Sequence, residues 1–179
     1  QTQDVEALST NSVAALLTGQ VIALTSEQVI ALRTDQAFAL TTGQAFALTS
    51  DQMLALETQD FASLSTAAIQ ALSTPIVSIL SSADIMALTT AQAQALATAQ
   101  AYALTSDQIA AMETRDVAVL ATNAIAALAT SQVVALRTDQ ALALATQQTV
   151  ALGTAQLVSM ETQDFASLST NSMAALLTA

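Results

Sequence analysis

The side chains that are best placed to do chemistry in this sequence are carboxylates that recur in pairs, three residues apart. The pairs are Glu57 with Asp60, Glu113 with Asp116, and Glu161 with Asp164. Two carboxylates on adjacent helix ends could bind a cation weakly or work as an acid and base pair. The alternative, which we favour, is that they are solvated charges near helix N-termini, where they interact favourably with the helix dipole. We therefore predict no catalytic, cofactor-binding or metal-binding residue.

The remaining polar residues give no stronger indication of catalysis. Arg33 with Asp35, and Arg137 with Asp139, are interpreted as surface ion pairs and not as substrate clamps. The sequence has no His to activate its many Ser and Thr hydroxyls and no Cys for thiolate chemistry. It also has no Gly-rich phosphate loop. We predict that the protein is not an enzyme and needs no cofactor.

Composition limits the classes of partner. The 179 residues include 3 Lys and Arg against 14 Asp and Glu, a net charge of -11, which argues against nucleic acid because phosphate contacts need clustered cations. Hydrophobic residues make up 53%, but polar residues interrupt every run of eight, so no segment should insert into a membrane. At Gln1 no basic region precedes an apolar stretch, which predicts no signal peptide, and the missing initiator Met suggests an excised fragment.

An eight-residue repeat organises the whole chain. Every eighth residue from Leu8 to Leu176 is Leu, except Met112 and Met160, and the residue two positions later is always Thr or Ser. Two residues further on is usually Gln, followed by an apolar residue. The consensus L-x-[TS]-x-Q-h-x-A runs through about 22 octads without an insertion. We therefore expect residues 1–179 to be a single array, and because neither end has a polar capping repeat, a slice of a longer one.

The period of eight restricts the secondary structure. In one continuous helix, eight residues turn through about 800°, so the leucines would not share a face. A β-solenoid of two or three octads per coil remains an alternative, although Ala and Gln are poor strand formers. The third option places the Thr or Ser at a helix N-cap, where its hydroxyl accepts an otherwise unpaired backbone N–H. The predicted N-caps are Thr10, Thr18, Ser26, Thr34, Thr42, Ser50, Thr58, Thr66, Thr74 and Thr90.

Each octad would then form one helix of about six residues, well below the length at which an isolated helix is stable in water. Neighbouring octads must therefore stack, which predicts an all-α solenoid coiled into a superhelix. We expect its core to be lined by the apolar residue after the Gln, by the alanine before each leucine, and by the leucines themselves. The predicted core leucines are Leu8, Leu16, Leu24, Leu32, Leu40, Leu48, Leu56 and Leu64.

Two positions of the octad have open interpretations. The Gln could hydrogen-bond exposed backbone ends of a neighbouring octad as a ladder, although its spacing after the Thr is not that of a capping box; otherwise it is a solvated helix former. In some octads the residue after the apolar one has a large apolar or aromatic side chain. We expect these side chains to point inward, and the alternative is a semi-apolar groove for a partner. They are Phe38, Phe46, Leu54, Met86, Tyr102 and Leu142.

The segment ALTSEQVIALRTDQAFAL from Ala23 to Leu40 resembles the alanine- and threonine-rich octapeptide tracts of large bacterial secreted or cell-surface proteins. The resemblance implies an extracellular or cell-surface setting and brings no catalytic residue with it. We expect a structural role, as a spacer, stalk or scaffold, with the adjacent repeats as partners and possible end-to-end self-association. The alternatives are a solenoid that binds a peptide or protein in a superhelical groove, and an ice-binding β-solenoid with a threonine-rich surface.

Overall fold

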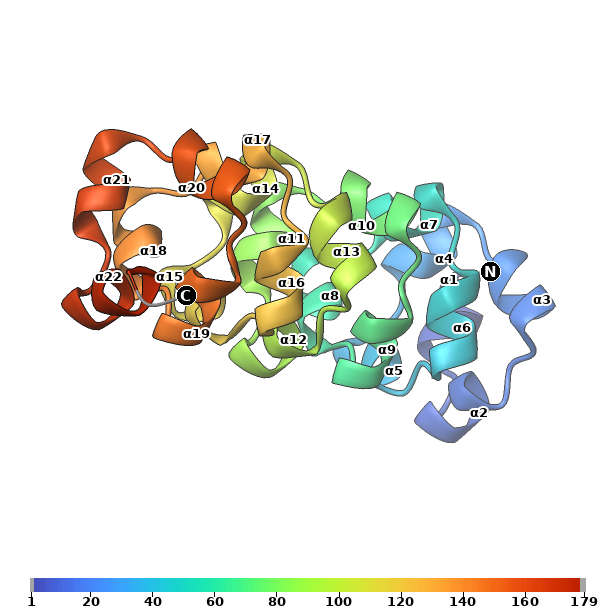
Figure 1. Cartoon of the computed structure of the whole chain (residues 1–179). Helices are drawn as coiled ribbons and strands as arrows, with labels where there is room; N and C mark the ends of the chain where they lie inside the picture. Colours follow the sequence, from blue (N-terminus) through green and yellow to red (C-terminus); the bar gives the residue numbers. More distant parts are fainter. Residues whose placement is uncertain (1, 178–179) are drawn as a thin grey trace. The chain divides into compact units, whose positions relative to one another are not determined.

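The computed structural model describes residues 2–177, which form short α-helices of five to seven residues joined by brief linkers (Figure 1). The chain divides into two compact units, residues 1–88 and 89–179. The first unit contains α1 (Thr2–Glu6), α2 (Thr10–Ala14), α3 (Thr18–Ile22), α4 (Ser26–Ile30), α5 (Thr34–Phe38), α6 (Thr42–Ala47), α7 (Ser50–Ala55), α8 (Thr58–Ser63), α9 (Thr66–Ala71), α10 (Thr74–Ile79) and α11 (Ser82–Ala87).

The second unit repeats the same element. It contains α12 (Thr90–Ala95), α13 (Thr98–Ala103), α14 (Ser106–Ala111), α15 (Thr114–Val119), α16 (Thr122–Ala126), α17 (Thr130–Val134), α18 (Thr138–Ala143), α19 (Thr146–Ala151), α20 (Thr154–Ser159), α21 (Thr162–Ser167) and α22 (Thr170–Leu176). Each helix occupies one octad, as the sequence predicts.

In most octads the leucine is the residue that ends the helix, as α9 illustrates. The backbone of Leu72 leaves the helical region, with φ -57° and ψ 134°, and its N–H donates to the carbonyl oxygen of Ile69. The Leu72 side chain is buried. Burial of the leucine thus fixes the point where the chain turns out of one helix, and Ser73 follows as the N-cap of the next.

The helices are stable because they stack in a solenoid. Within each unit a helix packs against the helix three positions away along the chain, for example α6 against α9 in the first unit and α15 against α18 in the second. One helix of five or six residues cannot hold its conformation alone, since nucleating a helix costs more than so few hydrogen bonds return. The predicted all-α solenoid with one short helix per octad is confirmed.

The core contains most of the predicted leucines. Leu32, Leu40, Leu48, Leu56 and Leu64 are buried. By contrast, the three leucines of the first turn are only half-buried, because no described helix covers that side of the turn. These are Leu8, Leu16 and Leu24.

The alanines before the leucines do not line the core, contrary to the prediction. Ala7, Ala15 and Ala23, in the first turn, are exposed, and the equivalent alanines of later turns, such as Ala31 and Ala39, are only half-buried. Most alanines of the core stand directly after the Gln, as Ala37 and Ala45 do, both with no exposed surface, and Ala68 and Ala124 stand at the Gln position itself. Small side chains are thus needed two residues earlier in the octad than we expected.

Residues 2–177 contain helices, turns and bends but no strand, so the β-solenoid alternative is wrong. Within the same residues, no helix has the length and apolar character needed to cross a membrane.

Candidate functional site

The helix N-caps lie one residue earlier than predicted. Thr41, for example, has an extended backbone and its hydroxyl accepts the N–H of Gln44, whereas Thr42 is already the first helical residue. The same correction applies to every predicted cap, each of which is the first residue of its helix: Thr10, Thr18, Ser26, Thr34, Thr42, Ser50, Thr58, Thr66, Thr74 and Thr90. The octads favour the earlier position because it places the Gln three residues after the cap.

That spacing lets the Gln side chain bond in two directions. Oε1 of Gln44 accepts the N–H of its own N-cap, Thr41, at 2.8 Å. Nε2 of Gln44 donates to the backbone oxygens of Val13 and Leu16, each at 2.8 Å. Gln44 therefore joins the start of α6 to the end of α2 and the linker after it. The bonds to Thr41 are those of a capping box, so the spacing argument against one was wrong.

The same arrangement recurs through both units and forms a glutamine ladder. In each case Nε2 reaches a carbonyl oxygen 28 to 31 residues earlier, and the side chain is buried. The residues that define the ladder are Gln36, Gln44, Gln52, Gln132, Gln140, Gln148 and Gln156. The ladder interpretation is confirmed, and the solvated one is wrong for these residues.

Where Asp replaces Gln, a threonine hydroxyl takes over part of this role. Oγ1 of Thr34 donates to Oδ1 of Asp60 at 2.8 Å, and Thr138 donates to Asp164 at 2.6 Å. Both pairs are 26 residues apart and join helices three octads apart. The sequence pattern does not reveal this pairing, because it depends on how many octads make one turn.

Asp116 is the exception among these carboxylates. Its side chain has no exposed surface, and neither carboxylate oxygen has a hydrogen-bond partner of normal geometry. Burial raises the pKa of Asp116, while Thr90 and the positive charge of Arg115 act in the opposite direction and the charge of Glu113 adds to the rise. Arg115 Nε lies 3.8 Å from Oδ1, too far for a strong bond. A desolvated, poorly compensated charge destabilises the fold.

Two arginines at N-cap positions make a second kind of bond across a turn. The Arg137 guanidinium donates to the backbone oxygen of Ala110 and pairs with Asp139, with 3.1 Å between Nε and Oδ1. The hydrogen bonds from Arg137 and from the Thr114 hydroxyl lower the pKa of Asp139 to about 2. Arg33 repeats the arrangement in the first unit, where its hydrogen bond lowers the pKa of Asp35. The predicted surface pairs therefore form, and the same guanidiniums also bind helix ends.

The predicted carboxylate pairs divide between two environments. Asp60 and Asp164 are buried against threonines, whereas Glu57 and Glu161, three residues before them, are exposed N-caps. Within residues 2–177 no group of three or more His, Cys, Asp or Glu is placed to hold a metal ion.

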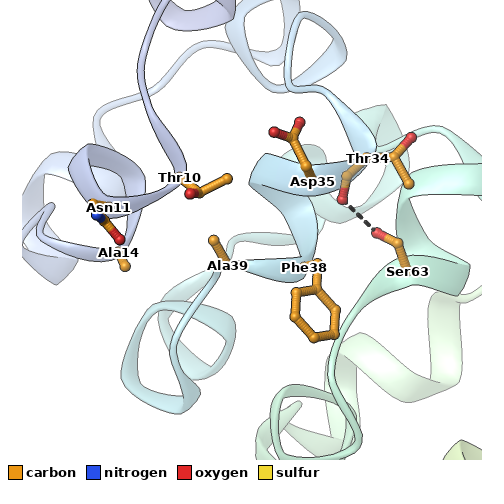
Figure 2. A pocket seen from close by; sticks show the side chains of 8 residues that line it. All are labelled: Thr10, Asn11, Ala14, Thr34, Asp35, Phe38, Ala39 and Ser63. Carbon is orange, nitrogen blue, oxygen red and sulfur yellow. Dashed lines mark hydrogen bonds between the residues drawn. The ribbon is translucent and has the colours of Figure 1, made fainter.

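An open hollow lies over α2, α5 and α8 of the first unit, as Figure 2 shows. Phe38 and Ala39 line it together with Asp35, and a hydrogen bond of 3.1 Å from Ser63 Oγ to the Thr34 carbonyl oxygen closes one side. Phe38 is 62% exposed. This hollow offers apolar contact area and one carboxylate already paired with Arg33.

The variable large residues point outward, so the expectation that they point inward is wrong. All are at least half exposed: Phe38, Phe46, Leu54, Met86, Tyr102 and Leu142. The position lies on the outer side of its helix because the two core positions, the residue before it and the leucine two residues later, both face inward.

The repeat itself is matched by a family model. The model described as the ALTTAQ repeat matches residues 1–34, 53–83, 77–114 and 109–146. The chain belongs to the ALTTAQ repeat family. A comparison with curated proteins found no match.

The letters of the ALTTAQ repeat occur unchanged at residues 87–92, and the structure gives each a role. Leu88 is the buried residue that ends a helix. Thr89 is the N-cap, and its hydroxyl accepts the N–H of Gln92. Thr90 begins the helix, and the side-chain Oε1 of Gln92 accepts the N–H of Thr89 at 2.7 Å. The ALTTAQ text is therefore a leucine stop, a threonine cap and a glutamine bridge.

Proposed function

We propose that this chain is a non-enzymatic structural region, a spacer or scaffold, of a larger bacterial secreted or cell-surface protein. The observation that carries the proposal is the glutamine ladder. Buried amides such as Gln44 and Gln140 use their polar atoms to join one turn of the solenoid to the next. These side chains hydrogen-bond the backbone inside the array and leave no polar atom for a ligand. This is typical of a region that maintains a fixed structure.

The charged and hydroxyl side chains support the same role. Thr34 and Thr138 bond to carboxylates three octads later, and Arg33 and Arg137 bond to helix ends of the preceding turn. Because each repeat is held by its neighbours, length can be added octad by octad without changing the contacts. A spacer needs this property.

Adding one turn tests the structural role. We would insert a second copy of residues 129–152, three octads, after residue 152 and measure the maximum dimension by small-angle X-ray scattering. A spacer should lengthen by about 10 Å, one helix-to-helix separation, with unchanged helix content per residue by circular dichroism. The control carries the same 24 residues in scrambled order. No lengthening, or equal lengthening with the control, would contradict the proposal.

A peptide- or protein-binding solenoid is the second candidate, and the exposed apolar side chains favour it. In the first unit, however, they lie on the consecutive helices α3 to α7, as Ile22, Ile30, Phe38, Phe46 and Leu54. Since each helix stacks on the third one before it, consecutive helices face different sides. The apolar residues are therefore spread around the unit, which favours the spacer.

The surface location rests on the resemblance to octapeptide tracts of secreted and cell-surface proteins. Protease treatment of intact cells of the source organism should cleave the protein, while a cytoplasmic marker stays intact. Protection of the chain until the cells are lysed would contradict a surface location.

A further inference from the structure

The hollow on the outer side of the first unit lies over α2, α5 and α8, and eight residues line it (Figure 2). Its volume is about 790 Å³, within the range of pockets that hold a ligand. Successive turns stack along the line from α2 to α5 to α8, so a neighbouring turn adds a helix beside these three and does not cover their outer side. The exposed apolar side chains of this unit form no continuous groove, but one of them, Phe38, borders this hollow.

The second unit repeats this arrangement 104 residues later, with two changes. Six of the eight lining residues recur unchanged, whereas Asn11 is replaced by Arg115 and Phe38 by Leu142. The hydrogen bond that closes one side of the hollow recurs as well, from Ser167 at 3.4 Å. The chain therefore contains a neutral, aromatic version of this surface and a positively charged, aliphatic one.

The wall that α2 contributes to the hollow has unused hydrogen-bonding groups. The Thr10 hydroxyl and the Asn11 side-chain amide make no hydrogen bond within residues 2–177. In the second unit the equivalent side chains are bonded inside the chain, because Thr114 donates to Asp139 and Arg115 pairs with a glutamate. The first unit thus leaves a hydroxyl and an amide available at the edge of an apolar surface.

The charge of the first unit restricts the kind of partner. Residues 1–88 contain eight Asp and Glu and one basic residue, Arg33. Arg33 already bonds to Asp35 and to backbone oxygens at a helix end, so it offers little to an anionic ligand. Behind the wall of the hollow, Asp60 accepts a hydrogen bond from Thr34 at 2.8 Å. The excess of carboxylates repels an acidic partner and attracts a basic one.

We propose that this hollow binds a basic segment of a partner protein, with an apolar side chain of the segment against Phe38. That side chain would contact the Phe38 ring, Ala14 and Ala39, and the Asn11 amide would hydrogen-bond the backbone of the segment. Lysine or arginine beside the apolar residue would interact with the carboxylates of the unit and with the exposed face of the ring, since aromatic faces attract cations. A second copy of this chain does not fit, because its net charge is -11.

The second unit does not offer the same site. Arg115 stands where the first unit has Asn11, and 65% of its side chain is exposed, so a positive charge would meet the basic segment. Leu142 gives no aromatic face for a cation. We therefore expect one site per chain. This docking site does not depend on the proposed spacer role, because a chain that binds nothing here could still lengthen octad by octad.

Fluorescence anisotropy with a labelled peptide tests the site on the full chain. The probe is a peptide of alternating leucine and lysine pairs, and two further peptides replace its leucines by serine or its lysines by glutamate. The leucine–lysine peptide should bind one to one. The serine peptide should bind about tenfold more weakly or worse because it lacks the apolar contact, and the glutamate peptide should not bind. Equal binding of the serine peptide, or no binding of the leucine–lysine peptide, would overturn the proposal.

Matched variants locate the bound peptide. Phe38→Ala removes the ring, and Asn11→Arg introduces the cation that the second unit has, so each should raise the dissociation constant about fivefold or more. Phe46→Ala is the control, because Phe46 is as exposed as Phe38, 66% against 62%, but lies on α6 outside the hollow. It should leave the constant unchanged, with equal helix content in all variants by circular dichroism. Equal weakening by Phe38→Ala and Phe46→Ala would place the peptide elsewhere and contradict the site.

Sedimentation equilibrium of the chain without peptide tests a second copy as the occupant. The mean mass should be the same for the unaltered chain, Phe38→Ala and Phe46→Ala at every concentration. Self-association that Phe38→Ala abolishes and Phe46→Ala keeps would show that another copy of the chain occupies the hollow, and the basic partner would be wrong.

Discussion

At the scale of single residues, the ladder glutamine has the most demanding position in the octad. Gln140 has no exposed surface, accepts the N–H of Arg137 at 2.8 Å, and donates to the oxygens of Ile109 and Met112 at 2.9 and 2.7 Å. Because burial removes water as an alternative partner, losing this one side chain leaves three backbone groups without their bonds.

We therefore expect Gln140→Ala to lower the free energy of unfolding by about 3 kcal/mol. Urea unfolding followed by circular dichroism measures the loss. Gln94→Ala is the matched control, since Gln94 is exposed, and it should change stability by less than about 0.5 kcal/mol. Equal effects of the two substitutions would show that the ladder bonds contribute nothing net.

Asp116 makes stability depend on pH in an unusual direction for a carboxylate. Its burial raises the pKa in the folded state, so the folded protein holds this proton more tightly than the unfolded chain does. The destabilisation caused by its charge is therefore present above the folded pKa and disappears as the pH falls toward the unfolded value of about 3.9. The charged groups on its own helix and N-cap are Arg115 and Glu113; α12 contributes Thr90, and the Arg137–Asp139 pair stands at the start of α18.

Asp116→Asn should raise stability at pH 7 by about 1 kcal/mol, and the gain should vanish near pH 4. Thermal unfolding of both proteins across this pH range measures it. Asp164→Asn is the control, because Thr138 already donates to that carboxylate, and it should bring no gain at pH 7. A gain for Asp116→Asn that grew on acidification would contradict the assigned direction.

At the scale of the element, the position of the N-cap decides which threonine caps the helix and whether the Gln can bond back to it. The Thr41 hydroxyl accepts the N–H of Gln44 at 3.3 Å, while Thr42, at the first helical position, is exposed. A cap at Thr42 would leave the Gln two residues away and break the reciprocal bond. The octad thus uses its second threonine as a helix starter whose hydroxyl is available to other turns, as Thr34 is for Asp60.

The threonine doublet allows a matched test of this assignment. Thr41→Val should cost about 1 kcal/mol because it removes the cap, and Thr42→Val should change stability by a few tenths of that. Both substitutions keep the branched side chain, so the difference in urea midpoint isolates the capping bond. If Thr42→Val lowered stability more than Thr41→Val, Thr42 would be the N-cap, as the sequence pattern suggested.

At the scale of the whole molecule, the array depends on keeping whole octads. Ladder bonds run to residues 28 to 31 positions earlier, so every bond that crosses an insertion must move to a new partner. An added octad supplies an equivalent partner, whereas a part of an octad places the wrong residue against each amide and leucine.

We expect duplication of residues 129–136, one octad, to leave a cooperative thermal transition within a few degrees of the original. Duplication of residues 129–132 alone should lower the midpoint by more than 10 °C, because it shifts Gln and Leu out of register on one side, at a cost of about 3 kcal/mol or more. Circular dichroism on heating measures both. Equal tolerance of the two insertions would mean that the turns do not depend on octad register.

The sequence by itself determined the period, the helix in each octad and the leucine core. These follow from local chemistry, since Leu32 and its equivalents recur at a spacing that no single helix or membrane span can use. The tertiary structure decided the partners. Whether Gln44 meets Val13 or solvent, and whether Asp60 meets Thr34, depends on how many short helices complete one turn. The number of helices in one turn is set by the packing of many side chains together, so it cannot be predicted from the sequence of a single octad. The same packing leaves Leu8 half-buried and Leu32 buried, although their octads share one pattern.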